Sequence, residues 1–463
     1  MLIRNAEIWG QGVADLRIVG ARIAEIGALA CHPGEPLIDA GRGALLPGLH
    51  DHHIHLAGLA ARASSVACGP PEVSDEAELA AALDQPGNGW LRGIGYHESV
   101  MDLPGADALD RLVSHRPLRI QHRSGRMWLF NSRGLEAILA NGHAPHGLER
   151  SGGQYTGRLF DEDHWLQQAL ASTPPDFAAA SAQLASYGVT GLTDMTPRND
   201  PVIAAYFTAQ QASGALVQQC WLAGTLDLAQ GRLGTCHLGP AKLHFHEAAM
   251  PDFDATVEFI AAAHAQSRGV AIHCTTEVEL VFALAALKAA GPQVGDRIEH
   301  ASIASPTQLR QFAAMGLAIC TQPHFVHERG DRYRLDVEPR HQGDLYRLRS
   351  IIEAGIPLAG GSDAPFGSAD PWQAMASAVS RQTGGGQPFG AGEALSPEQA
   401  LMLFLCHPER LAEVRTIKIG DPADLCLLDR PWAQARSRLN SADVRTTISA
   451  GRVVHDRVDQ PPV

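Results

Sequence analysis

Two histidines two residues apart, His53 and His55, are the first side chains along the chain with an evident chemical use. On a β-strand, residues i and i+2 point to the same face, so both imidazoles can bind one metal ion. Three further candidates end later apolar stretches: His273 in VAIHCT, His300 in RIEHAS and Asp363 in GGSDAP. One such histidine is more often a satisfied core residue than a ligand. Together, however, these residues predict a metal centre that activates water for hydrolysis.

The candidate ligands require parallel strands whose carboxyl ends meet, and most of the chain has the pattern that builds them. From about residue 177, apolar stretches alternate with amphipathic helical stretches, which is typical of βα units. Together with the segment that carries the histidine pair, this gives eight expected strands, at 44–56, 189–195, 216–224, 240–246, 270–275, 297–302, 317–323 and 357–363.

The expected fold class is therefore α/β, with a (β/α)8 TIM barrel whose active site lies at the carboxyl ends of the strands. An open, doubly wound sheet is the alternative. It gives no reason for eight strands or for chemistry spread over so many of them.

Three further features organise the rest of the chain. Residues 1–46 and 416–463 are both rich in short strands and turns, so we expect them to pair into one small β-sandwich. The barrel then comprises 47–56 and 177–415. The long stretch 57–176, rich in Gly, Pro and Arg, is an insertion after barrel strand one, and we expect it to form part of the substrate site.

Composition excludes several classes of function. The 463 residues carry a net charge of −13, which disfavours binding to nucleic acid. No stretch approaches the roughly eighteen consecutive apolar residues of a membrane span, and the start, MLIRNAEIWG, lacks the pattern of a secretory signal. We therefore expect a cytoplasmic enzyme with a small-molecule substrate and neither nucleic acid nor membrane as partner. Whether it forms a homo-oligomer stays open.

The segment PGLHDHHIH resembles the P-G-x-x-D-x-H-x-H signature of the amidohydrolase superfamily. The order HxH, Lys, His, His, Asp along strands one, four, five, six and eight is that of its binuclear members. The branch that includes N-substituted formamide deformylase shares further segments, namely WLRGIGYHES, MWLFNSRGL, GGQYTGRLFDE, LASYGVTGLTDM, GPAKL, RIEHA, GGSDAP and GDPADLCLLD. The resemblance therefore extends over nearly the whole chain.

This resemblance implies a hydrolase that cleaves a C–N bond of the amide type with two divalent metal ions, zinc foremost. A hydroxide that bridges the metals would attack the carbonyl carbon, and Asp363 would act as general base and then as general acid. Lys242, carboxylated by carbon dioxide, would bridge the ions. The implied ligands are His53, His55 and Asp363 for one metal, His273 and His300 for the other, and Lys242 for both.

The chain departs from the family pattern around the expected substrate site. Arg126 stands where the branch usually has a histidine, and we assign Arg126, Asn131 and His324 as candidate substrate contacts. The sequence leaves open the roles of five further residues, His97, Glu98, His244, His246 and His327.

Two other functions are weighed against this one. A mononuclear aminohydrolase that deaminates a heterocycle resembles the chain in HxH, His and Asp, but lacks the strand-four lysine. It carries a glutamate three residues after the strand-five histidine, whereas Glu277 follows His273 by four. A non-enzymatic barrel relative would typically have lost metal ligands, and this sequence retains all of them.

Overall fold

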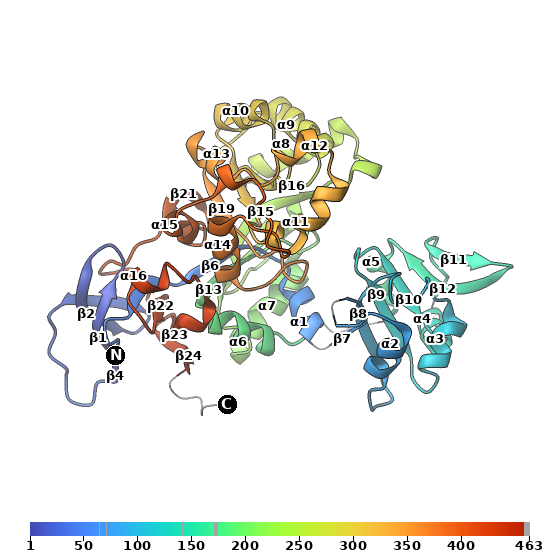
Figure 1. Cartoon of the computed structure of the whole chain (residues 1–463), viewed down its shortest axis with the longest axis horizontal. Helices are drawn as coiled ribbons and strands as arrows, with labels where there is room; N and C mark the ends of the chain where they lie inside the picture. Colours follow the sequence, from blue (N-terminus) through green and yellow to red (C-terminus); the bar gives the residue numbers. More distant parts are fainter. Residues whose placement is uncertain (64, 71, 141, 171–174, 458–463) are drawn as a thin grey trace. The chain divides into compact units, whose positions relative to one another are not determined.

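The computed structural model describes residues 1–463 except 64, 71, 141, 171–174 and 458–463 (Figure 1). The chain forms two compact units, one made of Met1–Leu56 with Phe177–Val463 and the other of Ala57–Asp176. The first unit contains a parallel barrel and a separate sheet, and the second has a sheet of its own.

The barrel is a nearly closed sheet of eight parallel strands, which confirms the predicted (β/α)8 fold. All eight predicted strands are present, and most are shorter than the sequence indicated. Their order around the sheet is β6 (Leu49–Ile54), β13 (Val189–Asp194), β14 (Gln219–Gly224), β15 (His237–His244), β16 (Val270–Cys274), β17 (Arg297–His300), β18 (Ala318–Thr321) and β19 (Leu358–Gly360).

Strand one and the end of strand eight meet at the carboxyl side of the barrel. The Asp363 N–H donates to the His53 carbonyl at 2.7 Å, and the His55 N–H donates to the Ala364 carbonyl at 2.9 Å. A Cβ atom added at Gly361 would lie 2.5 Å from the His53 Cβ, so only glycine permits this approach. The closure therefore brings the segment after β19 against the histidine pair of β6.

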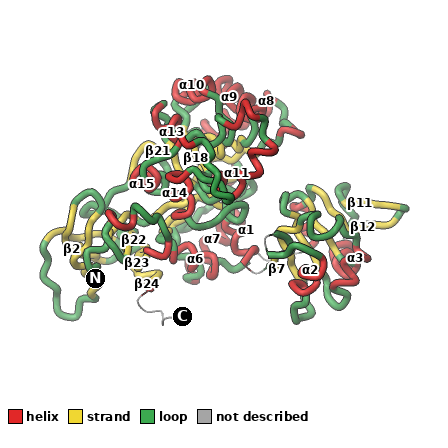
Figure 2. The backbone as a smooth tube through the Cα atoms, viewed as in Figure 1, coloured by secondary structure: helices red, strands yellow, loops and turns green. Residues whose placement is uncertain are grey.

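Helices follow the barrel strands, and their starts are set by local capping. Asp252 caps one helix, and Thr276 and Ser305 each form a capping box with the side chain three residues later. Figure 2 shows the helices on the outside of the strands. The barrel helices are α6 (Ala178–Ser186), α7 (Pro201–Ser213), α8 (Phe253–Ala265), α9 (Glu277–Ala290), α10 (Pro306–Met315), α11 (Phe325–Asp336), α13 (Leu348–Glu353) and α14 (Pro371–Ser380).

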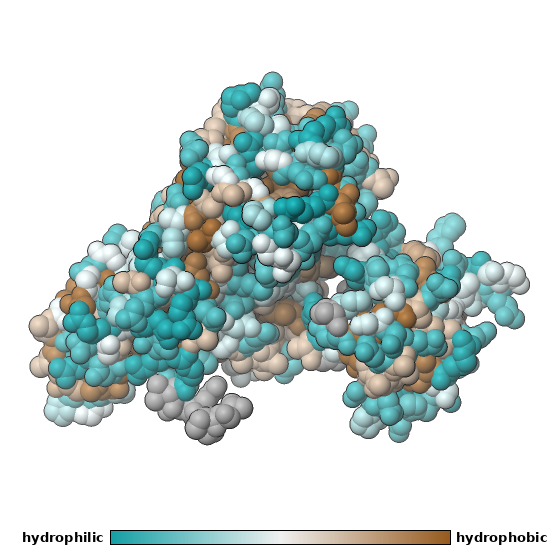
Figure 3. Space-filling view, viewed as in Figure 1, coloured by the Kyte–Doolittle hydropathy of each residue, from teal (hydrophilic) through white to brown (hydrophobic). Residues whose placement is uncertain are grey.

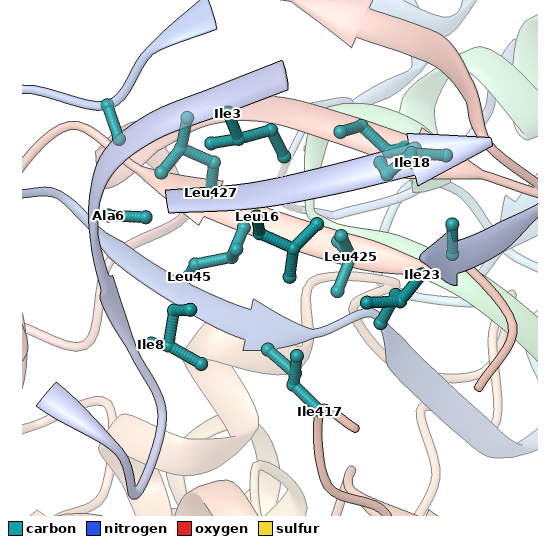
Figure 4. Close-up of a cluster of buried hydrophobic side chains, with 13 residues drawn as sticks. Ile3, Ala6, Ile8, Leu16, Ile18, Ile23, Leu45, Ile417, Leu425 and Leu427 are labelled. Atoms are coloured by element: carbon teal, nitrogen blue, oxygen red, sulfur yellow. The ribbon is translucent and has the colours of Figure 1, made fainter. Parts of the chain in front are cut away.

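Both chain ends pair into one sheet through β5 (Ala44–Pro47) and the antiparallel β22 (Leu425–Leu428). Side chains from along the sheet, among them Ile3, Leu16 and Leu45, meet in one buried cluster, so the sheet must curve around it (Figure 4). The other strands are β1 (Leu2–Ile8), β2 (Gly12–Val19), β3 (Arg22–Gly27), β4 (Leu37–Asp39), β23 (Val444–Ser449) and β24 (Arg452–Asp456).

The second unit is a six-stranded mixed sheet with its own buried clusters. Its first three strands are parallel, although the sequence showed no βα rhythm there, because β7 has only two residues and glycines interrupt β8. The elements are β7 (Val66–Ala67), α2 (Glu76–Leu83), β8 (Leu91–Tyr96), α3 (Ala106–Leu112), β9 (Leu118–His122), β10 (Met127–Phe130), α4 (Ser132–Leu139), β11 (Leu148–Ser151), β12 (Gln154–Phe160) and α5 (Asp163–Ala169).

Hydrophilic residues dominate the face shown in Figure 3, as the charged composition leads one to expect. In the described part of the chain, no helix is both long and apolar enough to cross a bilayer. The helix α1 (Leu56–Ala63) begins at the last residue of the first segment of unit one and continues into the second unit. The first unit also has the short elements α12 (Pro339–Gln342), α15 (Pro397–Met402), β20 (Cys406–His407), β21 (Arg410–Val414) and α16 (Trp432–Ala435).

Candidate metal centre

Three candidate ligands converge where β6 meets the segment after β19. The Asp363 Oδ1 lies 3.4 Å from the His53 Nε2 and 3.2 Å from the His55 Nε2. Two atoms bound tetrahedrally to one ion at about 2.1 Å lie about 3.4 Å apart. The spacing is therefore that of three ligands around one metal ion, and these side chains have the chemistry to hold it.

The two later histidines lie beside this group. His273 is on β16 and His300 ends β17, and the centroids of their rings are 4.5 Å apart. The His300 ring is also 4.8 Å from that of His53. Four imidazoles from three strands thus occupy one small region at the carboxyl end of the barrel.

Lys242 on β15 points its amine into the same interior. The residue is 6% exposed, and within the described part of the chain its Nζ has no hydrogen-bond partner. Burial lowers its pKa below the ordinary value, with further lowering from Arg297 opposed by Glu299 and Asp363. A buried amine without a partner is unfavourable as it stands, which indicates that this group has another chemical form or a ligand.

The protonation states suit metal binding. Burial lowers the pKa of His53, His273 and His300, so these imidazoles are neutral and offer a lone pair. Burial alone would raise the pKa of Asp363, but its hydrogen bond with His55 and the nearby His53 and His300 hold it below its usual range. Asp363 is therefore an anionic carboxylate.

Two of the candidate ligands have strained backbone conformations. His300 has φ 69° and Asp363 has φ 52°, and Ala301 after His300 has φ 45°. Residues other than glycine rarely adopt the left-handed region, and such strain clusters at functional sites. At His300 the turn also breaks the alternation of β17, which brings its side chain to the interior.

Two buried acceptors that the sequence motifs did not indicate, Glu299 and Gln322, orient the imidazoles. Glu299 lies 2.5 Å from the His53 Nδ1, and the Gln322 Oε1 lies 2.7 Å from the His300 Nδ1. Each acceptor places the ring proton on Nδ1 and leaves Nε2 free for a metal. For Glu299, the available signal was the presence of two charged residues, Arg297 and Glu299, on an expected barrel strand.

Asp51, the aspartate of PGLHDHHIH, fixes the backbone around the site. Its Oδ1 accepts the His53 N–H at 3.1 Å and the Ser362 N–H at 2.9 Å. The carboxylate thus ties β6 to the segment that carries Asp363. Burial raises its pKa to about 6.

The other histidines near the barrel mouth have different surroundings. His244 is exposed, and its ring lies 4.3 Å from that of His273. His246 accepts the Ala248 N–H and caps a short turn, and His327 is exposed on α11. His324 is fully buried and donates to the Ser362 carbonyl at 3.0 Å, so it supports the strand-eight segment and does not face a substrate through that nitrogen.

In the second unit, the candidate substrate contact Arg126 and the unassigned His97 and Glu98 have intramolecular partners. Arg126 is paired with Asp161 through two hydrogen bonds of 2.7 and 2.6 Å, which occupy one bidentate edge of its exposed guanidinium. His97 and Glu98 follow β8, and Glu98 lies 3.2 Å from the His122 Nε2.

The proposed substrate contact at Asn131 is corrected by its hydrogen bonds. Asn131 is fully buried and caps α4: its Oδ1 accepts the N–H groups of Leu118 and Gly134, and its Nδ2 donates to the carbonyls of Val113 and Arg116. Its amide has no capacity left for a substrate. The sequence could not distinguish this cap from a binding residue.

We therefore expect Asn131→Ala to be a stability variant. Loss of the cap and of buried partners costs about 2–4 kcal/mol, so thermal unfolding should begin at a lower temperature, while KM of the folded enzyme stays unchanged. Asn131→Asp keeps the cap oxygen but sets its second oxygen against the carbonyls of Val113 and Arg116, so it should lose at least as much stability as the alanine variant, again with KM unchanged. A wild-type melting curve with a raised KM would restore the substrate role.

The chain is similar to known proteins along nearly its whole length. A model of the amidohydrolase family matches residues 37–455. The N-substituted formamide deformylase of Arthrobacter pascens is 24% identical over 526 aligned residues, which cover 98% of this chain and 97% of that protein. A metal-dependent hydrolase of Pyrococcus horikoshii OT3 has the same fold, with a TM-score of 0.76 at 17% identity over 93% of this chain and 97% of that chain. The atrazine chlorohydrolase TrzN of Arthrobacter aurescens TC1, solved with zinc, has a TM-score of 0.56 at 14% identity over 99% of this chain and 97% of that chain.

The barrel, the histidines and aspartate gathered at its strand ends and the family match together define the class of the protein, a metal-dependent hydrolase. The chain is a member of the amidohydrolase family. It is thus an enzyme that hydrolyses carbon–nitrogen bonds with the help of a divalent metal.

Proposed function

We propose that this enzyme hydrolyses the amide-type C–N bond of a small N-acyl or N-formyl amine at a centre of two divalent metal ions. The observation that carries the proposal is the spacing of 3.2 and 3.4 Å around the Asp363 carboxylate, next to two further neutral imidazoles. The ligands would be His53, His55 and Asp363 for one ion and His273 and His300 for the other, with Lys242 shared.

Bound ions would supply Lewis acidity and would lower the pKa of a coordinated water from 15.7 towards about 7. The protein's own residues supply the rest. Asp363 is the ionised carboxylate that lies beside the Nε2 atoms of both His53 and His55, so it can take the proton of the attacking water and give it to the leaving nitrogen. The nitrogen then departs as a neutral amine.

Lys242 fits the bridging role only in a modified form. A protonated amine has no lone pair for a cation, but a neutral amine adds to carbon dioxide and loses a proton, which gives a carbamate with two oxygens. Burial lowers the pKa of Lys242 and so favours the neutral amine that this reaction requires. The carbamate would form at the Nζ, which has no hydrogen-bond partner among the described residues. The carbamate would add negative charge between two cations. Zinc is the metal we expect first, as in the related chlorohydrolase solved with zinc.

The alternative, deamination of a heterocycle by a mononuclear centre, has less support. Glu277, the nearest candidate for its glutamate, is on α9, and its carboxylate lies 3.9 Å from the His341 Nε2. The Glu277 side chain is 47% exposed, so it is directed to solvent.

Metal removal followed by substrate screening tests the proposed reaction. We expect chelator-treated enzyme to be inactive, and zinc, manganese or cobalt to restore hydrolysis of members of a panel of N-substituted formamides, N-acyl amino acids, dipeptides and cyclic amides. Release of the amine shows C–N cleavage. Ammonia from a heterocycle as the sole product, or turnover that survives chelation, would contradict the proposal.

A further inference from the structure

A buried carboxylate that is not among the candidate ligands lies between His53 and Arg297. The Glu299 Oε2 is 2.5 Å from the His53 Nδ1, and the Glu299 Oε1 accepts the Arg297 Nε–H at 2.5 Å. All three side chains are almost fully buried: His53 is 1% exposed, Glu299 0% and Arg297 4%. The carboxylate therefore has its contacts inside the barrel and none with solvent.

The contact between Glu299 and His53 is a hydrogen bond and not a second metal site. Glu299, His53 and Cys320 come within 4.8 Å of one another and resemble a ligand group. However, two ligands of one ion lie about 3.4 Å apart, and 2.5 Å is too short for that.

A carboxylate can only accept, so Glu299 places the ring proton of His53 on Nδ1. The Nε2 lone pair is then directed to Asp363, 3.4 Å away. Arg297 acts on the same segment in a second way, because its Nη2 donates to the His52 carbonyl at 3.0 Å. Glu299 therefore holds the ring of His53, and Arg297 holds the peptide group that precedes it. Both charged residues come from β17.

We propose that Glu299 is a positioning residue of the metal centre: with Arg297 behind it, it fixes the tautomer and orientation of His53 and makes Nε2 a stronger ligand. This inference rests on the proposed function, since it takes His53 to be a ligand. A purely structural role, in which Glu299 only neutralises the buried Arg297, would affect stability and leave metal affinity unchanged.

The test measures zinc affinity of the metal-free enzyme by competition with a chromophoric chelator. Loss of such an orienting carboxylate typically weakens metal binding roughly 10–100-fold, and we expect this for Glu299→Gln. Asp296→Asn is the matched control: it removes another buried carboxylate, which lies 2.9 Å from His264, a histidine outside the candidate ligand set. The control should bind zinc as the wild type does.

Two further measurements keep the outcomes separable. Because Glu299→Gln leaves Arg297 unpaired, the double variant Arg297→Met/Glu299→Gln removes both charges and should show the same loss. The imidazole ¹⁵N spectrum of metal-free wild type should show His53 protonated on Nδ1. Unchanged zinc affinity in the variants, or His53 protonated on Nε2 in the wild type, would overturn the inference; failure of the wild type to bind zinc would overturn the proposed function instead.

Discussion

Asp363→Asn should lower kcat on the order of a hundredfold or more, because general acid and base catalysis contributes at least that much. The amide oxygen can still coordinate a metal, but it cannot take the proton of the attacking water. Asparagine also tolerates the left-handed backbone at φ 52°, so the variant keeps the local fold. The measurement is kcat with the metal content of the same preparation.

The proton transfer is isolated if Asp363→Asn loses turnover while it retains its metal. Asp363→Ala is the matched variant, and it should lose turnover and also metal, since it removes the oxygen that lies 3.2 Å from the His55 Nε2. Near wild-type kcat in metal-replete Asp363→Asn would mean that another group moves the proton.

Lys242→Ala should lose activity and at least one metal ion per chain. The carbamate would be the protein anion offered to both ions, and it would offset more of the repulsion between two neighbouring cations than neutral imidazoles can. The side chain is buried and its Nζ is unpartnered in the described structure, so its removal breaks no hydrogen bond there. Metal analysis and turnover would be measured together.

Chemical rescue separates this role from a loss of packing. Short-chain carboxylic acids can stand in for the carbamate, so they should restore part of the activity of Lys242→Ala. His244→Ala, on the same strand, is the control and should bind metal nearly normally, although its ring lies 4.3 Å from that of His273. If His244→Ala lost both metals and Lys242→Ala kept them, the assignment of Lys242 as the bridging ligand would be wrong.

The barrel could be predicted because its signals are local and repeated. Apolar strands alternate with capped helices, and the carboxyl ends of parallel strands must share one side. That rule alone predicted that His273, His300 and Asp363 would meet the pair on β6. It did not need a view of the side chains.

Other features could not be predicted, because long-range contacts and unusual backbone conformations produce them. Strand alternation places Glu299 and His300 on opposite faces, but the φ of 69° at His300 lets both reach His53. Asn131 was misassigned for a similar reason. Its place in a motif does not reveal that the side-chain amide forms hydrogen bonds with four backbone groups. One of these groups is in its own helix, and the others lie earlier in the chain.

Elemental analysis of the well-metallated wild-type enzyme tests the central claim most directly. The five imidazole and carboxylate ligands together with Lys242 exceed what one four-coordinate ion needs, so we predict two divalent ions per chain, with activity rising as both are restored. One ion at full activity, or none, would contradict a binuclear hydrolytic centre.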